Sequence, residues 1–126
     1  MNDYKTIRKI AEIEEYIGSA GVVSFDFETS PTEKYRSDGK AALDAHKADI
    51  TGVSLSVKAG TGRYIPLRHR VGKNASIPSV MAFLRQRVFQ NPKTVKIAHN
   101  MAFEAMFLYK DCLLYTSPSP RDGLLS

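Results

Sequence analysis

The pattern of hydrophobic and polar positions divides the chain into alternating helical and strand-like segments. Isoleucines at spacings of three and four, with charged residues between them, predict an amphipathic helix over residues 3–17. Asn2 or Asp3 is the predicted N-cap, and the glycines after residue 17 end the helix. The run VVSFDF at 22–27 is rich in β-formers and predicts a buried strand.

The rest of the pattern predicts a loop, two more strands, a helix, a strand and a helix. Residues 30–49 carry many charges, a proline and a glycine, which favours a long loop with a helical turn near 41–46. The later elements are predicted at 50–57 and 63–67 (strands joined by a turn at 59–62), 78–90 (helix, with Pro78 at its start), 95–98 (strand) and 100–110 (helix).

This order of elements indicates an α/β fold with a mixed sheet and flanking helices. Three strands form an antiparallel part, and a crossover helix leads to a fourth strand that is parallel to the first. The 126 residues, 43% hydrophobic and 25% charged, are typical of one globular domain. No apolar run approaches the roughly 20 residues of a membrane span, and no signal peptide is evident, so we expect a cytoplasmic protein without a membrane partner. The net charge of +5 allows a polyanionic partner.

The C-terminal segment 112–126 differs from the rest of the chain. It has no helical or strand period, and two prolines within three residues are incompatible with a continuing helix. The stretch CLLYTSPSPRD can be written in codons that match a transposon-type sequencing adapter. We therefore predict that 112–126 is non-native and disordered, and that 1–111 is the natural portion, whose continuation is missing. This portion contains no cysteine, because the single cysteine is Cys112.

Two carboxylates end the first predicted strand. Asp26 and Glu28 lie two residues apart, and such residues point to the same side of a strand. Their repulsion beside an apolar core is costly unless a cation neutralises it, and Mg²⁺ and Mn²⁺ prefer oxygen ligands. The alternative is a strand end that simply faces water.

A third carboxylate follows the last predicted strand. The run AHNMAFE at 98–104 joins a strand end to a helix start, where Asn100 can cap the helix and the helix dipole favours Glu104. Good capping without chemistry is the alternative. However, open α/β sheets place their sites at the carboxyl ends of strands. If the two strands are neighbours, Asp26, Glu28 and Glu104 converge.

These motifs resemble a known family. The run VSFDFET at 23–29 matches the first motif of DEDD-type 3′–5′ exonucleases, and 98–104 looks like the second. The runs at 50–56 and 64–69 are similar to strands of the proofreading domain in family A, polymerase I-like DNA polymerases of phage or bacterial type. The resemblance covers residues 4–110. It implies a ribonuclease H-like fold that is incomplete at the C-terminus, because nothing after Lys110 supplies the third motif, a Tyr or His followed by Asp.

The resemblance also implies a mechanism. Two divalent metal ions (Mg or Mn), held by the catalytic carboxylates Asp26, Glu28 and Glu104, would hydrolyse the 3′-terminal phosphodiester of single-stranded DNA. The family's second motif usually ends in Asp, so Glu104 reaches one methylene further. Because the third motif is missing, we expect the chain as written to be inactive or very weakly active. A polymerase domain is expected downstream. The resemblance implies that Thr29, Asn100 and Phe103 bind the substrate.

Several interpretations remain open at this point. A basic stretch around the third strand could meet the DNA backbone or could be a solvated, charged edge; it comprises Arg63, Arg68, His69, Arg70 and Lys73. The domain could instead be an RNase D-like 3′–5′ exoribonuclease with the same carboxylates. It could also be a non-catalytic nucleic-acid-binding module, or an unrelated α/β domain that carries the motifs by chance.

Overall fold

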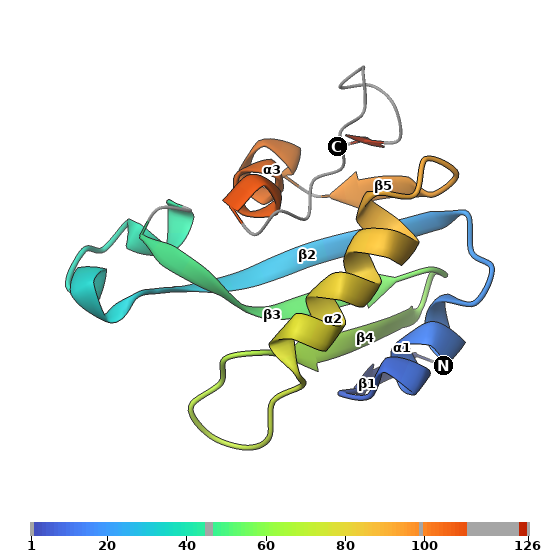
Figure 1. Cartoon of the computed structure of the whole chain (residues 1–126), viewed down its shortest axis with the longest axis horizontal. Coiled ribbons are helices and arrows are strands. Elements are labelled where there is room, and N and C mark those ends of the chain that lie inside the picture. Colours follow the sequence, from blue (N-terminus) through green and yellow to red (C-terminus); the bar gives the residue numbers. More distant parts are fainter. Residues whose placement is uncertain (1, 45–46, 99, 111–123, 126) are drawn as a thin grey trace.

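The computed structural model describes residues 2–44, 47–98, 100–110 and 124–125 (Figure 1). Side chains of 101–103, 109–110 and 124–125 are outside this description. The described strands form one six-stranded sheet in the order β1-β4-β3-β2-β5-β6. The strands are β1 (Asp3–Thr6), β2 (Val22–Pro31), β3 (Ala48–Ser56), β4 (Thr61–Pro66), β5 (Val95–Ala98) and β6 (Leu124–Leu125). The α-helices are α1 (Ile10–Ile17), α2 (Ile77–Leu84) and α3 (Met101–Lys110).

The predicted α/β fold with a mixed sheet is confirmed. β3 pairs antiparallel with both β2 and β4, whereas β5 pairs parallel with β2. The helix α2 makes the crossover from β4 to β5 and lies across the sheet (Figure 1). The long loop between β2 and β3 contains two short 3₁₀ turns, Glu33–Tyr35 and Ala41–Leu43.

The predicted helical start at residue 3 is wrong. Asp3–Thr6 forms β1, which pairs parallel with Thr61–Tyr64 at the outer edge of β4. The helix α1 begins only at Ile10, and the Glu12 carboxylate accepts a hydrogen bond from the Lys9 backbone N–H at 3.1 Å. An open strand edge thus offers these residues backbone partners, and this long-range pairing overrides the helical pattern.

The predicted helix over 78–90 is present, but its C-terminal part is π-helical rather than α-helical. A π-helical turn, Arg85–Phe89, follows α2, and the Gln90 N–H donates to the Arg85 carbonyl at 2.7 Å. Val88 and Phe89 are consecutive, and both are fully buried. The wider turn therefore directs two adjacent side chains into the core.

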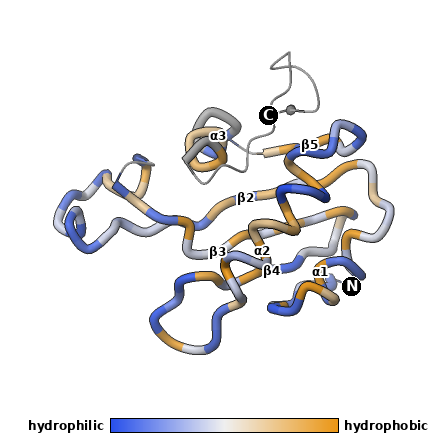
Figure 2. The backbone as a smooth tube through the Cα atoms, viewed as in Figure 1, coloured by the Kyte–Doolittle hydropathy of each residue, from blue (hydrophilic) through white to orange (hydrophobic). Residues whose placement is uncertain are grey.

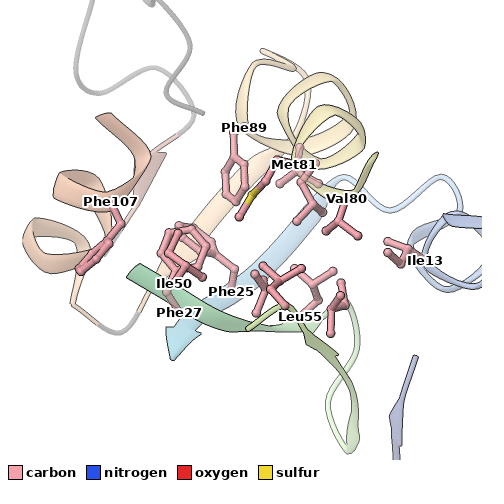
Figure 3. Packing of buried hydrophobic residues seen from close by; sticks show 14 of the residues in the cluster. Ile13, Phe25, Phe27, Ile50, Leu55, Val80, Met81, Phe89 and Phe107 are labelled. Atoms are coloured by element: carbon pink, nitrogen blue, oxygen red, sulfur yellow. The ribbon is translucent and has the colours of Figure 1, made fainter. Parts of the chain in front are cut away.

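The core lies between the sheet and the helices α1 and α2. Along β2, the buried Val23, Phe25 and Phe27 alternate with exposed residues. The rings of Phe25 and Phe27 meet the ring of Phe89, with centroid distances of 5.0 and 6.0 Å (Figure 3). Apolar residues gather where α2 crosses the sheet, while the β2–β3 loop and the β4–α2 loop are mostly hydrophilic (Figure 2). We call the face of the sheet that packs against α1 and α2 the helix-covered face.

The opposite face of the sheet carries polar and small residues. We call it the open face, and its side chains include those of Tyr4, Ser24, Asp26, Glu28, Ser54, Ser56 and Tyr64. A groove of about 460 Å³ runs over it from β1 to β2 and ends at Asp26.

Two residues of the C-terminal segment 112–126 are described. Leu124–Leu125 form β6, which pairs parallel with Lys96 and Ile97 of β5. Residues 111–123 and 126 lie outside the described residues. The non-native origin of this segment stays a prediction.

Candidate metal centre

The site begins where β2 extends beyond its neighbour β5. β5 pairs only with Val22–Phe25, whereas β3 accompanies β2 as far as Pro31. Beyond Phe25, therefore, no described strand pairs with β2 on its β5 side. The chain turns out of β5 at this point, and α3 starts beside the free edge.

Glu104, in the first turn of α3, occupies this free edge. Its side chain is 1% exposed, and its Oε2 accepts a hydrogen bond from the Phe27 backbone N–H at 3.2 Å. The Glu104 N–H donates to the Asn100 carbonyl at 3.0 Å, which sets the start of the helix. The Glu104 carboxylate thus accepts the hydrogen bond that the Phe27 N–H would donate to β5 if β5 were longer.

Asp26 and Glu104 lie next to each other. Burial, followed by a hydrogen bond and the charge of Asp26, raises the pKa of Glu104 to about 8, although the bond from the Phe27 N–H opposes the shift. Among the described residues, no Lys, Arg or His forms an ion pair with either carboxylate. Two carboxyls that meet without a basic partner need either a shared proton or a bound cation.

Glu28 lies on the same face as Asp26 but has other neighbours. Its side chain is 60% exposed, and Oε1 lies 3.7 Å from Nε2 of His69. The charge of Glu28 also acts on the nearby Tyr64 hydroxyl and contributes to the raised pKa of Tyr64. The structure therefore brings Asp26 and Glu104 together and leaves Glu28 beside them. No group of three metal-binding side chains forms within the part of the chain that is described.

The three substrate-side residues have different surroundings. Thr29 follows a β-bulge at Glu28/Thr29, and its hydroxyl donates to the Ala42 carbonyl at 2.6 Å. Asn100 is exposed at the start of α3. Phe103 lies in α3, but its side chain is outside the described residues. Their contacts with a nucleotide stay predictions.

The sequence pattern does not place Tyr64 and His69 in the site. Both lie in the run 64–69 that carries the family resemblance, and His69 also belongs to the basic stretch. The usable signal is the strand alternation in β4, which places Tyr64 opposite Ser54 on the same face as Asp26. No local signal would have placed His69 there, because it lies after the strand.

The basic stretch is only partly available to a partner. Arg63 pairs with Asp3 at 3.0 Å and lies over the Tyr16 ring, at 4.4 Å from its centroid. Arg68 donates to the Ile50 carbonyl. The guanidinium groups of Arg63 and Arg68 thus have partners within the fold, although Arg68 is exposed as Arg70 and Lys73 are.

Comparison with known proteins agrees with this geometry. The model of the 3′–5′ exonuclease domain of the DNA polymerase A type matches residues 4–119. The chain therefore belongs to this 3′–5′ exonuclease family, whose members are metal-dependent nucleases. It is 32% identical over 91 residues to a DNA-directed DNA polymerase of Pseudomonas phage M6, a match that covers 71% of this chain but 13% of the polymerase.

Solved structures with the same fold are distant in sequence. The EXO domain of Aedes aegypti Nibbler is 14% identical with a TM-score of 0.64, and the match covers 98% of this chain and 52% of that one. Trypanosoma brucei RNase D is 12% identical with a TM-score of 0.67, at 98% and 37% coverage. Brucella melitensis NrnC with bound Mg²⁺ is 18% identical with a TM-score of 0.53, at 95% and 48% coverage. These similarities show the ribonuclease H-like exonuclease fold. None of the described helices is long and apolar enough to cross a bilayer.

Proposed function

We propose that the chain carries the metal-binding part of a 3′–5′ exonuclease site that removes nucleotides from the 3′ end of single-stranded DNA. One observation carries the proposal: the Asp26 and Glu104 carboxyls, from β2 and α3, meet where β5 ends. The phage polymerase relative supports DNA as the substrate.

The residues present fit a divalent cation. The donors are carboxylate oxygens, which Mg²⁺ and Mn²⁺ prefer, and the described residues place no basic side chain in an ion pair with Asp26 or Glu104. When bound, two such ions would supply positive charge that stabilises the phosphodiester as it is hydrolysed. Asp26, Glu28 and Glu104 are the residues that would hold them.

Each carboxylate contributes differently. Glu104 is anchored by the Phe27 N–H and shielded from water, so one of its oxygens has a fixed position. Asp26 is exposed on the open face, where its carboxylate is accessible to a cation. Glu28, one step further along β2, widens the site toward β4. We expect the exposed Asn100, Thr29 at the bulge of β2, and Phe103 of α3 to contact the terminal nucleotide.

The wider context follows from the relative. The chain corresponds to only 13% of the length of the phage polymerase, which supports a polymerase domain elsewhere in the same protein. Such a protein would act in the cytoplasm of a bacterial or phage-infected cell. The single-stranded 3′ end leaving the polymerase domain would be its substrate.

Metal binding tests the proposal directly. Mn²⁺ titrated into the unsubstituted chain, followed by electron paramagnetic resonance, should show binding that Asp26→Asn and Glu104→Gln each weaken at least tenfold. Glu33→Gln, an exposed carboxylate in the β2–β3 loop, is the matched control and should leave the affinity unchanged. Circular dichroism checks that each variant is folded. Equal affinities across all four proteins would contradict the proposed site.

The substrate is tested with matched oligonucleotides. DNA and RNA of one sequence, labelled at the 5′ end, are incubated with the chain and Mn²⁺. We expect Mn²⁺-dependent binding that favours DNA, with at most trace shortening from the 3′ end. Preference for RNA would favour the RNase D-like alternative. Rapid trimming abolished by Asp26→Ala would support the function and overturn the expectation of weak activity.

A further inference from the structure

The open face carries a hydrogen-bonded group that the proposed site does not use. The Tyr64 hydroxyl and Nε2 of His69 are 2.5 Å apart, and their rings meet edge to face at a centroid distance of 5.5 Å. Nε2 of His69 lies 3.7 Å from Oε1 of Glu28. Tyr64 belongs to β4, His69 to the loop after it and Glu28 to β2, so three separate segments meet at one carboxylate.

The backbone on both sides holds this group in place. Asn74 closes the loop around His69, because Oδ1 of Asn74 accepts from the His69 N–H at 2.8 Å and Nδ2 donates to the His69 carbonyl at 2.9 Å. The Tyr64 ring lies over Gly52, where an added Cβ would overlap the ring. Gly52 pairs with Glu28 in the sheet, so the missing side chain at Gly52 lets the Tyr64 hydroxyl approach Glu28.

The Tyr64 hydroxyl can act as the donor in this contact, because a tyrosine hydroxyl carries its proton at neutral pH. A carboxylate that is 60% exposed, as Glu28 is, samples several rotamers unless a partner selects one.

We propose that Tyr64 and His69 are positioning residues that hold the Glu28 carboxylate in place for cation binding. The role in cation binding rests on the proposed function, whereas the contact of Tyr64 and His69 with Glu28 does not. Partners of this kind orient metal-ligating carboxylates, and their loss typically weakens metal affinity about 10- to 100-fold. The role of Glu28 in the site is thereby coupled to β4, a strand that contributes no carboxylate itself.

Tyr4 provides a matched control on the same face. Its ring also leans over a glycine, Gly62, and it is 64% exposed, but no hydrogen bond links its hydroxyl to a carboxylate within the described residues. Removing one hydroxyl from Tyr64 and one from Tyr4 is therefore the same chemical change, and only the first should affect Glu28.

The first measurement uses the metal-free chain. The side-chain carboxyl ¹³C resonances of Asp and Glu are assigned, and Tyr64→Phe is compared with Tyr4→Phe. We expect Tyr64→Phe to shift the Glu28 resonance, whereas Tyr4→Phe leaves it in place. If the Glu28 resonance does not shift in Tyr64→Phe, the proposal is overturned, regardless of the Mn²⁺ affinity.

The second measurement is Mn²⁺ affinity. Tyr64→Phe and His69→Gln should each weaken binding about tenfold, and Tyr4→Phe less than twofold. Gly52→Ala, which displaces the Tyr64 ring, should weaken Mn²⁺ binding as much as Tyr64→Phe does. The double variant with both substitutions should bind Mn²⁺ no more weakly than either single variant. Unchanged affinity in both Tyr64→Phe and His69→Gln overturns the role in cation binding. If the unsubstituted chain binds no Mn²⁺ while Tyr64→Phe still moves the Glu28 resonance, the proposed function fails and the positioning contact is upheld.

Discussion

The two faces of the same sheet are built for different purposes. On the helix-covered face, Phe25, Phe27 and Leu55 are buried against α2 and the π-helical turn after it. On the open face, one residue along each strand, Asp26 and Ser54 are exposed. Because side chains alternate along a strand, each strand contributes to the stability of the fold with one set of residues and to the site with the other. Among the described residues, only Glu104 is buried and also belongs to the candidate site.

Breaking the helix-covered face should have the largest effect. Phe89→Ala removes the ring that contacts both Phe25 and Phe27, and we expect the free energy of unfolding to fall by about 3–5 kcal/mol. Urea unfolding followed by circular dichroism measures the change. Tyr4→Ala, which truncates an exposed aromatic ring on the open face, should cost less than about 1 kcal/mol. Similar losses in the two variants would contradict the division between the faces.

The buried carboxyl predicts a pH dependence of stability. The pKa of Glu104 is raised from an ordinary value of 4.5 to about 8, so the folded chain binds this proton more tightly than the unfolded chain does. The resulting stabilisation is complete below pH 4.5 and is lost as the pH rises toward 8, by on the order of a few kcal/mol. Urea unfolding of the metal-free chain between pH 4.5 and pH 8.5 tests this, and Glu104→Gln should flatten the profile. If the free energy of unfolding instead rises between pH 4.5 and pH 8.5 in the unsubstituted chain but not in Glu104→Gln, the predicted direction of the Glu104 effect is wrong.

Asp26 tests the coupling between the exposed and the buried carboxyl. Asp26→Asn weakens the hydrogen bond and removes the charge that help to raise the pKa of Glu104, so this pKa should fall. The metal-free variant should then lose less stability between pH 4.5 and pH 8.5 than the unsubstituted chain does, as measured by urea unfolding. The same variant should bind Mn²⁺ more weakly. A smaller loss of stability together with weaker Mn²⁺ binding is the result expected if the two carboxyls share one site. An unchanged loss of stability would contradict this coupling.

Two neighbours on β3 give the smallest and most direct comparison. Ser54→Ala changes the open face and should alter the free energy of unfolding by no more than about 0.5 kcal/mol. Leu55→Ala, one residue further on, changes the helix-covered face and should cost about 2–5 kcal/mol. Thermal and urea unfolding of the two variants measure the contrast. A cost above about 1 kcal/mol for Ser54→Ala would mean that the open face also contributes packing.

Local pattern was sufficient for the elements that are long or strongly periodic. The strands that became β2, β3 and β5 lie within a few residues of their predicted bounds, and α2 together with the π-helical turn after it fills the predicted helix. The exception is instructive. Residues 3–6 share the charged, amphipathic character of the helix after them, and only the free edge of β4 makes them a strand. A local pattern carries no information on an edge that forms some 60 residues later in the chain.

The candidate site divides in the same way. The motifs placed Asp26 and Glu104 at strand ends, and the rule that sites gather at the carboxyl edge of a sheet anticipated their meeting. The burial of Glu104 and its bond to the Phe27 N–H were not predictable, since they depend on β5 ending earlier than β2. The partners of Glu28 were missed for a similar reason, because His69 reaches it only through the closed loop at Asn74.

The amino-acid sequence by itself thus determined the family, the order of the main elements and the carboxylates of the candidate site. These properties reside in short runs, where residue type and spacing are sufficient. Only the tertiary structure decided which carboxyl is buried, which is exposed, and which residues of β4 and the loop after it lie beside Glu28. Such properties depend on where one strand stops beside another, and the free energy of a charge depends on everything that packs around it.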